Sequence, residues 1–342
     1  NENAADRRSV LNFVDWCVNK AGGQAKRYGL IFSGHSLGFE DKGLFRDDSS
    51  GKSMKIADLF FLIQRIILPK DSLEDLAKSN KLKGEERERE TKELIGQRLD
   101  ILGFDSCVMG MLEVGYQFCD VAKTMIASEG SVPSAGWTYA KILGGLARGE
   151  HRHKSAQKVA EHFVKEFIDS QDKYTVGGVS VDMAAWDMSR LRGLADALDG
   201  LAEVLIDCFE DPDSRAYKQM ERMILQAHWK CQSYMWDQNV DLGDLCELLY
   251  SECELFAKEL GGDETQILKA VQKACRKVLT NLEKTVILSG FSGGGYQYSN
   301  GISVFFPWSW NAYRVSQKNY ESTWYAKDSK NMNFKSKWLG WA

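Results

Sequence analysis

The segment that decides the fold is LDILGFDSCVMG, residues 99–110. Its first six residues are mostly apolar, which is typical of a strand buried inside a sheet. The run then stops at three polar or reactive residues, Asp105, Ser106 and Cys107. A buried strand that ends at a carboxylate and a thiol predicts a chemically active loop at the end of that strand.

Four further short apolar runs lie on either side of this segment. They cover residues 28–33, which stop at Gly34-His35, and residues 121–127, 179–184 and 301–306. Stretches with helical periodicity separate them, beginning at residues 9–20. This alternation is typical of a mostly parallel sheet with helices on both faces, so the sequence predicts an α/β fold. The glycine-rich residues 290–295 predict a flexible turn ahead of the last strand.

The imidazole of His35 and the thiol of Cys107 each follow directly after a predicted strand. In open α/β sheets, ligands bind beyond the carboxyl ends of the strands, so we expect these two side chains to meet at one edge of the sheet. We also expect a helix to begin at Cys107. Its N-terminus would lower the pKa of the thiol and offer N–H groups to an oxyanion.

The two halves of the chain differ in composition. Residues 1–180 carry most of the predicted strands and form the expected catalytic region. Residues 181–342 are helix-rich, with long amphipathic helices predicted at 191–205 and 241–256, and return one strand (301–306) to the fold. Residues 70–93 consist largely of Lys, Arg, Asp and Glu and form a charged insertion, predicted as a solvated helix with a mobile excursion as the alternative.

Composition excludes several classes of protein. A net charge of −4 gives no basic surface for nucleic acid, and no apolar run approaches the roughly 18–20 residues that span a bilayer. Eight scattered cysteines without a CxxC pair predict mostly reduced core thiols, and the pair His151 and His153 predicts no zinc site. The chain begins at Asn1 without a signal-like stretch, so we expect a missing beginning. Together with the thiols, this favours the cytoplasm slightly over secretion.

The segment around Cys107 resembles the nucleophile segment of clostripain-like cysteine peptidases, and residues 30–35 resemble their histidine strand. Similarity continues in the same order at residues 47–51, 127–137, 181–191 and 299–307. The resemblance implies a caspase-like fold, as in legumain and gingipain, and a Cys107–His35 dyad that cleaves peptide bonds after Arg or Lys. The family's first strand should precede the opening helix, and it is absent from this sequence.

The resemblance also implies a binding site for the substrate. Asp105 would pair with the substrate's basic side chain, and Ser128 and Glu129 would contribute further contacts. The backbone N–H groups of Ser36 and Cys107 would hold the oxyanion. No cofactor is required for this chemistry.

Two positions depart from the family pattern. Ser36 replaces the glycine that commonly follows the catalytic histidine, and its side chain crowds that turn. Ala135 occupies a position that can be acidic in the family. The specificity pocket would then hold one carboxylate instead of two, which weakens the expected preference for basic residues.

Some relatives are activated by cutting themselves between the histidine and cysteine strands, and the basic residues between Lys70 and Lys92 would offer such a site here. Some relatives use calcium, for which oxygen ligands would come from two acidic pairs, Glu40-Asp41 and Asp47-Asp48. Solvated surface carboxylates are the alternative interpretation of these pairs. A regulatory domain or subunit outside this chain is a further expected partner.

Two other functions stay open at this point. One is a non-catalytic or partner-regulated interaction module that retains the peptidase fold, motivated by Ser36, Ala135 and the absent first strand. The other is a hydrolase of non-peptide amides. The expected partner of the site is a protein or peptide substrate, with neither nucleic acid nor membrane.

Overall fold

The computed structural model describes residues 5–22, 25–40, 44–47, 50–149, 154–171, 179–209, 215–234, 238–257, 263–307 and 309–328. A five-stranded sheet lies at its centre, in the order β1 (Gly29–Ser33), β2 (Leu99–Asp105), β3 (Ala122–Ala127), β4 (Val181–Asp187) and β7 (Val286–Ser292). β1, β2 and β3 pair in parallel, whereas β4 is antiparallel to both of its neighbours. Only β4 therefore runs against the other four strands, and the predicted α/β fold with a mostly parallel sheet is confirmed.

Four of the five predicted apolar runs are strands of this sheet. The fifth, β8 (Ser303–Phe305), belongs to a three-stranded sheet with β5 (Ser233–Tyr234) and β6 (Asn239–Asp241). The turn predicted at residues 290–295 is wrong for its first half, because Gly290 and Phe291 pair with β4 inside β7. Pairing with a neighbouring strand orders this glycine-rich segment, and local sequence does not reveal such pairing.

Alternate residues of β2 face two different layers of helices. Leu102 and Phe104 pack in the larger core, which includes α2 (Ile56–Ile67), α5 (Leu112–Phe118) and α9 (Leu191–Asp207). Ile101 joins a smaller core with α6 (Tyr139–Ala147) and α7 (Ala156–Ile168). Side chains alternate along a strand, so Asp105 lies on the same face as Ile101, towards α6 and α7. The side chain of Asp105, a candidate site residue, therefore lies on this face of the sheet.

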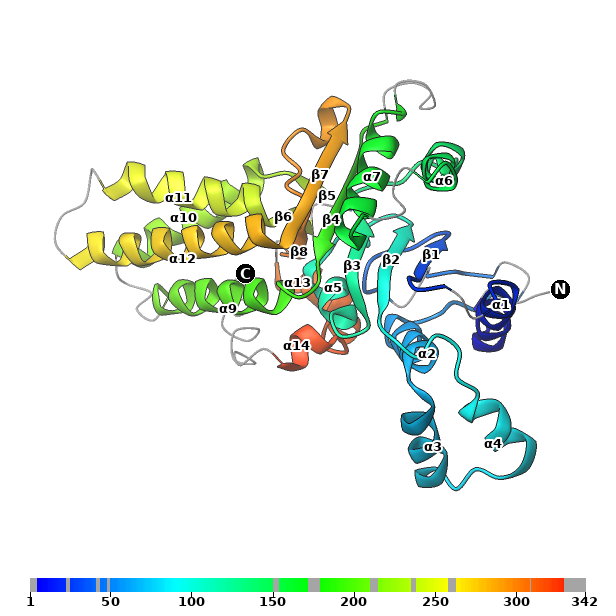
Figure 1. The fold of residues 1–342 in the computed structure, drawn as a ribbon. Coiled ribbons are helices and arrows are strands. Elements are labelled where there is room, and N and C mark those ends of the chain that lie inside the picture. Colours follow the sequence, from blue (N-terminus) through cyan, green and yellow to red (C-terminus); the bar gives the residue numbers. More distant parts are fainter. Residues whose placement is uncertain are drawn as a thin grey trace.

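The second half of the chain is helix-rich, as predicted. α9, α10 (Arg215–Lys230), α11 (Leu242–Ala257) and α12 (Asp263–Thr285) form an arm that extends to one side of the central sheet (Figure 1). α13 (Trp310–Tyr320) and α14 (Trp324–Asp328) follow β8. The division at residue 180 stays a prediction, although the central sheet takes strands from both sides of it. Among the helices of the described residues, none combines the length and apolar character that crossing a bilayer requires.

The first helix and the state of the cysteines also agree with the predictions from the sequence. α1 (Arg7–Lys20) covers the first predicted helix. All eight cysteines are free thiols and six of them are buried, in agreement with the prediction of reduced core residues.

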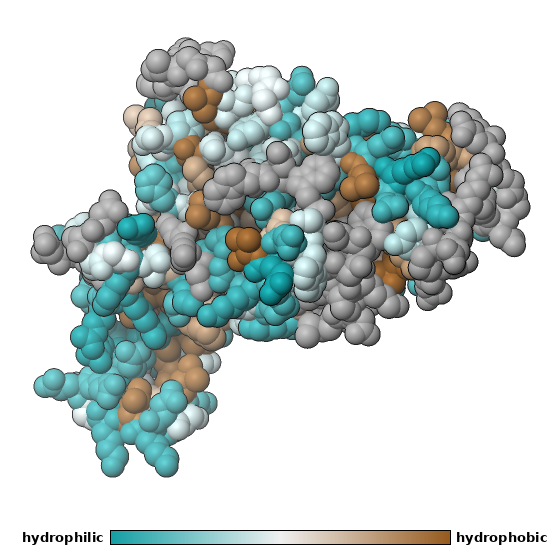
Figure 2. All heavy atoms as spheres, turned by 180° about the vertical axis from the view of Figure 1, so that it is seen from behind, coloured by the Kyte–Doolittle hydropathy of each residue, from teal (hydrophilic) through white to brown (hydrophobic). Residues whose placement is uncertain are grey.

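The charged insertion between β1 and β2 is helical. α3 (Lys70–Ser79) and α4 (Gly84–Thr91) form a projection that stands away from the sheet and is largely hydrophilic on its surface (Figures 1 and 2). The buried Arg65 of α2 fastens this projection by donating hydrogen bonds to the carbonyls of Arg89 (3.1 Å) and Lys92 (2.9 Å). The predicted solvated helix is thus confirmed as two short helices, joined by a turn at residues 80–83.

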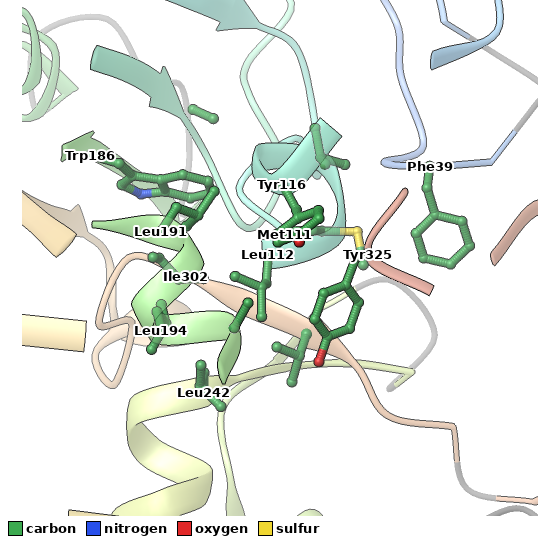
Figure 3. Packing of buried hydrophobic residues seen from close by; sticks show 14 of the residues in the cluster. Phe39, Met111, Leu112, Tyr116, Trp186, Leu191, Leu194, Leu242, Ile302 and Tyr325 are labelled. Atoms are coloured by element: carbon green, nitrogen blue, oxygen red, sulfur yellow. The ribbon is translucent and has the colours of Figure 1, made fainter. Parts of the chain in front are cut away.

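A close contact between a helix and the sheet lies directly behind the loop that carries Cys107. The indole of Trp186 on β4 is fully buried between Leu191 and helix α5 (Figure 3). A Cβ atom placed on Gly115 of α5 would lie 2.5 Å from the Trp186 ring and 3.0 Å from Leu191. The absence of a side chain at Gly115 therefore sets how closely α5 approaches the sheet.

We expect Gly115→Ala to lower the free energy of unfolding by up to about 2 kcal/mol, because overpacking costs about 1–3 kcal/mol and the gain in helix propensity offsets only ~1 kcal/mol of it. Gly200→Ala in α9 is a matched control, since its added Cβ would meet only the Lys277 Nζ, at 3.9 Å. This control should be neutral or slightly stabilising. Urea unfolding measures both variants, and equal effects of the two substitutions would contradict the packing argument.

Candidate active site

The parallel pairing of β1 with β2 delivers His35 and Cys107 to the same edge of the sheet. Ser33 pairs with Asp105 at the last position of the register, and His35 and Cys107 each lie two residues further on. The N–H of Gly34 donates to the Asp105 carbonyl at 3.2 Å. The two strands therefore end at the same level, with the imidazole and the thiol on adjacent loops.

A side-chain contact joins these two loops directly. The hydroxyl of Ser36 donates to the carbonyl of Cys107, so the serine that replaces glycine bridges the two loops. The carbonyl of His35 accepts from the N–H of Phe45 at 3.2 Å, and its imidazole is exposed to solvent. The Cys107 thiol is half-buried and accepts from the N–H of Val132 at 3.3 Å.

The predicted helix at Cys107 is wrong. α5 begins at Leu112, and residues 107–111 form a turn in which Val108 has φ of +59°. Hydrogen bonds to the segment after β3 hold this turn in place: Val108 N–H donates to Gly130 (2.9 Å), and Gly110 N–H donates to Ser128 (2.7 Å). The turn is therefore fixed by tertiary hydrogen bonds, and no helix N-terminus adjoins the thiol.

Two backbone donors are open at the site. Within the described residues, the N–H groups of Ser36 and Cys107 donate to no acceptor, although Ser36 is only 3% exposed. A buried N–H without an acceptor is uncommon in folded proteins. These are the two donors that the sequence indicated for an oxyanion.

Asp105 lies beneath the segment that leads into α6. Its carboxylate is 3% exposed, and its Oδ2 accepts hydrogen bonds from Ser33 Oγ (3.1 Å) and Tyr139 OH (2.9 Å). Its Oδ1 has no partner among the described residues. A Cβ atom on Gly136 would lie 2.7 Å from Oδ2, so only glycine fits over this carboxylate. A buried carboxylate oxygen without a donor marks Asp105 as a candidate for cation binding.

Ser128 and Glu129 lie elsewhere than expected. Both are fully buried, and their side chains bond the Asp182 carbonyl (2.6 Å) and the Gly301 N–H (2.8 Å) respectively. They therefore face the interior and are not surface groups for a substrate. In the structure they fix the segment after β3, and the carbonyls of this segment bond the turn that carries Cys107.

A buried network of three carboxyl groups supports this segment. Asp182 accepts from the N–H groups of Glu129 (2.7 Å) and Gly130 (2.8 Å), and Asp241 accepts from the N–H groups of Asp244 (2.7 Å) and Asn300. Burial raises the pKa of Asp182 to about 7 and that of Asp241 to about 6. Burial and the two neighbouring carboxylates raise the pKa of Glu129 well above its ordinary value. The folded protein therefore holds a proton on Glu129 more tightly than an exposed glutamate does.

The sequence reasoning missed several of these residues. Asp182 is a single carboxylate inside the apolar start of β4, and this position is a signal for a buried hydrogen-bonded acid. Asp241 ends the three-residue strand β6 beside Val240 and carries no such signal. Ser33 and Tyr139 carry no comparable signal, because only the folded chain brings them to Asp105.

Metal binding receives no structural support. The described residues include no cluster of three or more His, Cys, Asp or Glu side chains that could hold an ion. Asp41 and Asp48 of the two acidic pairs lie outside the described residues, as do His151 and His153. Calcium therefore stays a prediction.

Comparisons with known proteins agree on one family. The model of the clostripain family, Peptidase_C11, matches residues 85–338. Clostripain of Hathewaya histolytica is 25% identical over 228 residues, which cover 58% of this chain but only 38% of that protein. A secreted C11 cysteine protease of Bacteroides thetaiotaomicron, solved with an irreversible peptide inhibitor, has a TM-score of 0.60 at 15% identity, over 97% of this chain and 79% of that one. An inactive zymogen C11 protease of Parabacteroides distasonis has a TM-score of 0.55 at 17% identity, over 96% and 77%. The two structures show a shared fold.

The carboxyl network predicts a dependence of stability on pH. A carboxyl group with a raised pKa in the folded state binds its proton more tightly there than in the unfolded chain. Its stabilising contribution is complete below about pH 4 and is lost as the pH rises through the folded-state pKa. We expect the free energy of unfolding to fall by at least about 1 kcal/mol between about pH 4 and pH 7.

Glu129→Gln should make this slope shallower, because the amide keeps an acceptor for the Gly301 N–H but does not titrate. Glu86→Gln on the exposed face of α4 is the matched control and should leave the slope unchanged. Urea unfolding at a series of pH values measures all three proteins. An identical slope in the native chain and Glu129→Gln would contradict the assignment.

Proposed function

The chain belongs to the clostripain family of cysteine peptidases, and from this premise we propose that it is an endopeptidase that cleaves after basic residues through a Cys107–His35 dyad. The observation that carries the proposal is the register of β1 and β2, which ends both strands level with each other. The hydroxyl of Ser36 then ties the histidine loop to the Cys107 carbonyl. The part of the chain that aligns with clostripain spans 38% of that protein's length.

The proposed mechanism assigns one step to each group. Asp105 holds the basic side chain of the substrate, which positions the scissile bond over the thiol. Cys107 transfers its thiol proton to His35, the resulting thiolate attacks the peptide carbonyl, and the open N–H groups of Ser36 and Cys107 stabilise the oxyanion. His35 then donates a proton to the leaving amine and later activates the water that releases the acyl-enzyme. A dyad is sufficient, since a thiol needs less activation than a hydroxyl.

One observation favours the alternative of a non-catalytic module. In the structure, one segment covers both groups that a substrate would need: Val132 bonds the Cys107 thiol, and Gly136 lies over the Asp105 carboxylate. A peptidase has to displace these contacts when substrate binds, whereas an interaction module has no such requirement. Labelling with a substrate-like inhibitor distinguishes the two functions.

We expect an acyloxymethyl ketone with a terminal Lys or Arg to label the native chain covalently, and Cys107→Ala to abolish labelling. His35→Ala should slow labelling by roughly 10²–10⁴-fold, the usual contribution of general acid–base catalysis. Cys17→Ala, which removes a half-buried thiol of α1, is the control and should react like the native chain. Intact-mass spectrometry measures the outcome. A native chain that stays unlabelled would favour the non-catalytic module, and turnover of small amides without protein cleavage would favour the amide hydrolase.

We further propose that the chain cuts itself in the turn between α3 and α4. The turn at residues 80–83 is non-helical and exposes Lys81 and Lys83, and exposed turns are preferred sites of proteolysis. Arg87 and Arg89 lie within α4, where a helix resists the extended conformation that a protease requires. The relative described as an inactive zymogen supports activation by processing.

Replacing both Lys81 and Lys83 by Gln should therefore prevent self-cleavage, as should Cys107→Ala. The matched double variant with Arg87→Gln and Arg89→Gln should still be cut. Mass spectrometry of the purified protein over time locates the new termini. A native chain that is fully active as a single intact band would contradict the proposal.

The sequence-based preference for the cytoplasm receives no support from the relatives, one of which is described as secreted. On that ground we propose export. A peptide or protein is the proposed substrate, and a regulatory domain outside this chain remains a proposal as well.

A further inference from the structure

The two oxygens of the Asp105 carboxylate differ in the number of hydrogen bonds that they accept. Oδ2 accepts two hydrogen bonds, from Ser33 Oγ (3.1 Å) and from Tyr139 OH (2.9 Å), whereas Oδ1 accepts none among the described residues. Each carboxylate oxygen offers about two lone-pair positions. Both positions of Oδ2 are therefore occupied, and only Oδ1 remains for a substrate cation.

The two basic side chains place different demands on a carboxylate. The planar guanidinium of arginine binds best through two parallel hydrogen bonds, one to each carboxylate oxygen. The ammonium of lysine is a compact point charge that needs no paired acceptors. A carboxylate with one free oxygen satisfies lysine but denies arginine its second hydrogen bond.

The space around Asp105 favours the same choice. The carboxylate is 3% exposed, and Gly136 lies so close that an added Cβ would be 2.7 Å from Oδ2. Trp137 is 2% exposed and packs on Gly103 of β2, which prevents the site from deepening along the sheet. A substrate cation reaches Oδ1 only when the backbone at Gly136 and Trp137 moves away from the carboxylate. An ammonium requires a smaller displacement of this backbone than a guanidinium does.

The phenol of Tyr139 remains a hydrogen-bond donor to Asp105. Burial and the adjacent Asp105 carboxylate raise the pKa of Tyr139, so the phenol keeps its proton throughout the working pH range of a peptidase. Ser33 is on β1, whose register with β2 is fixed by five paired positions. Neither donor therefore leaves Oδ2 without a change in the protein.

We propose that Ser33 and Tyr139 are specificity-determining residues that make this site select lysine over arginine in the residue that precedes the scissile bond. This inference rests on the proposed function of the same site. The exposed turn at residues 80–83 is consistent with it, because the basic residues of that turn are lysines.

The test compares three peptides of identical sequence that end in lysine, arginine or norleucine before a fluorogenic leaving group. For the native 342-residue chain, we expect kcat/KM for lysine to exceed that for arginine by about tenfold, the worth of one charge-assisted hydrogen bond. Tyr139→Phe keeps the ring but frees one hydrogen-bonding position of Oδ2. This variant should raise kcat/KM for the arginine peptide relative to that for the lysine peptide by about tenfold. Ser33→Ala should act in the same direction through the other position, which provides a second variant if one of them folds poorly. Tyr298→Phe removes an exposed hydroxyl and should leave the ratio unchanged.

The lysine-to-arginine ratio within one preparation is unaffected by a loss of folded enzyme, so a merely structural role of Tyr139 would lower all three rates together. That uniform loss would overturn the inference, and so would a native chain that prefers arginine. Turnover of neither lysine nor arginine peptides would instead overturn the proposed function, and the inference with it. A native preference for lysine that both substitutions weaken would support it.

Discussion

The site depends on one constraint, which is the register between β1 and β2. Five consecutive pairs, from Gly29 with Ile101 to Ser33 with Asp105, fix where each strand stops and therefore where the imidazole and the thiol emerge. The same register fixes which face each side chain occupies. A slip by one residue would move Asp105 from the α6–α7 face to the opposite one and separate its carboxylate from Tyr139. The proposed catalysis and selectivity thus both rest on a single set of backbone hydrogen bonds.

The loop of the nucleophile is supported by buried polar groups, and no helix dipole contributes. The N–H groups of Val108 and Gly110 bond the segment after β3, and that segment bonds Asp182 on β4 and, through Glu129, Gly301 just before β8. Burying three carboxyl groups is costly unless each one is hydrogen-bonded or neutral. Here Asp182 and Asp241 accept hydrogen bonds from backbone N–H groups, and the raised pKa values of the three carboxyl groups make the network sensitive to pH. Parts of the chain as distant as β3 and the loop before β8 are thereby coupled to the geometry of the thiol.

Local sequence was sufficient wherever the signal was local. Short apolar runs predicted β1 to β4, and reactive residues directly after two of them predicted His35 and Cys107 as a pair. The start of α5 could not be predicted, because the turn before it is held by Gly130 and Ser128 from another strand. The same reason applies to Glu129, for which the resemblance implied a contact with the substrate. Its burial results from contact with Gly301, 172 residues further along the chain. The positions of Ser33, Gly136 and Tyr139 around Asp105 likewise exist only in the folded chain.

The anchoring of the charged projection has a consequence for the molecule after a nick. Arg65 precedes the α3–α4 turn in the chain, whereas its two carbonyl partners at residues 89 and 92 follow it. The ion pair between Glu74 and Arg87 (2.6 Å) also spans the turn. In addition, β1 precedes the α3–α4 turn in the chain and β2 follows it, and these two strands are paired in the central sheet. A protein cut there would therefore persist as a two-chain complex, separable under denaturing conditions yet unchanged in its native assembly.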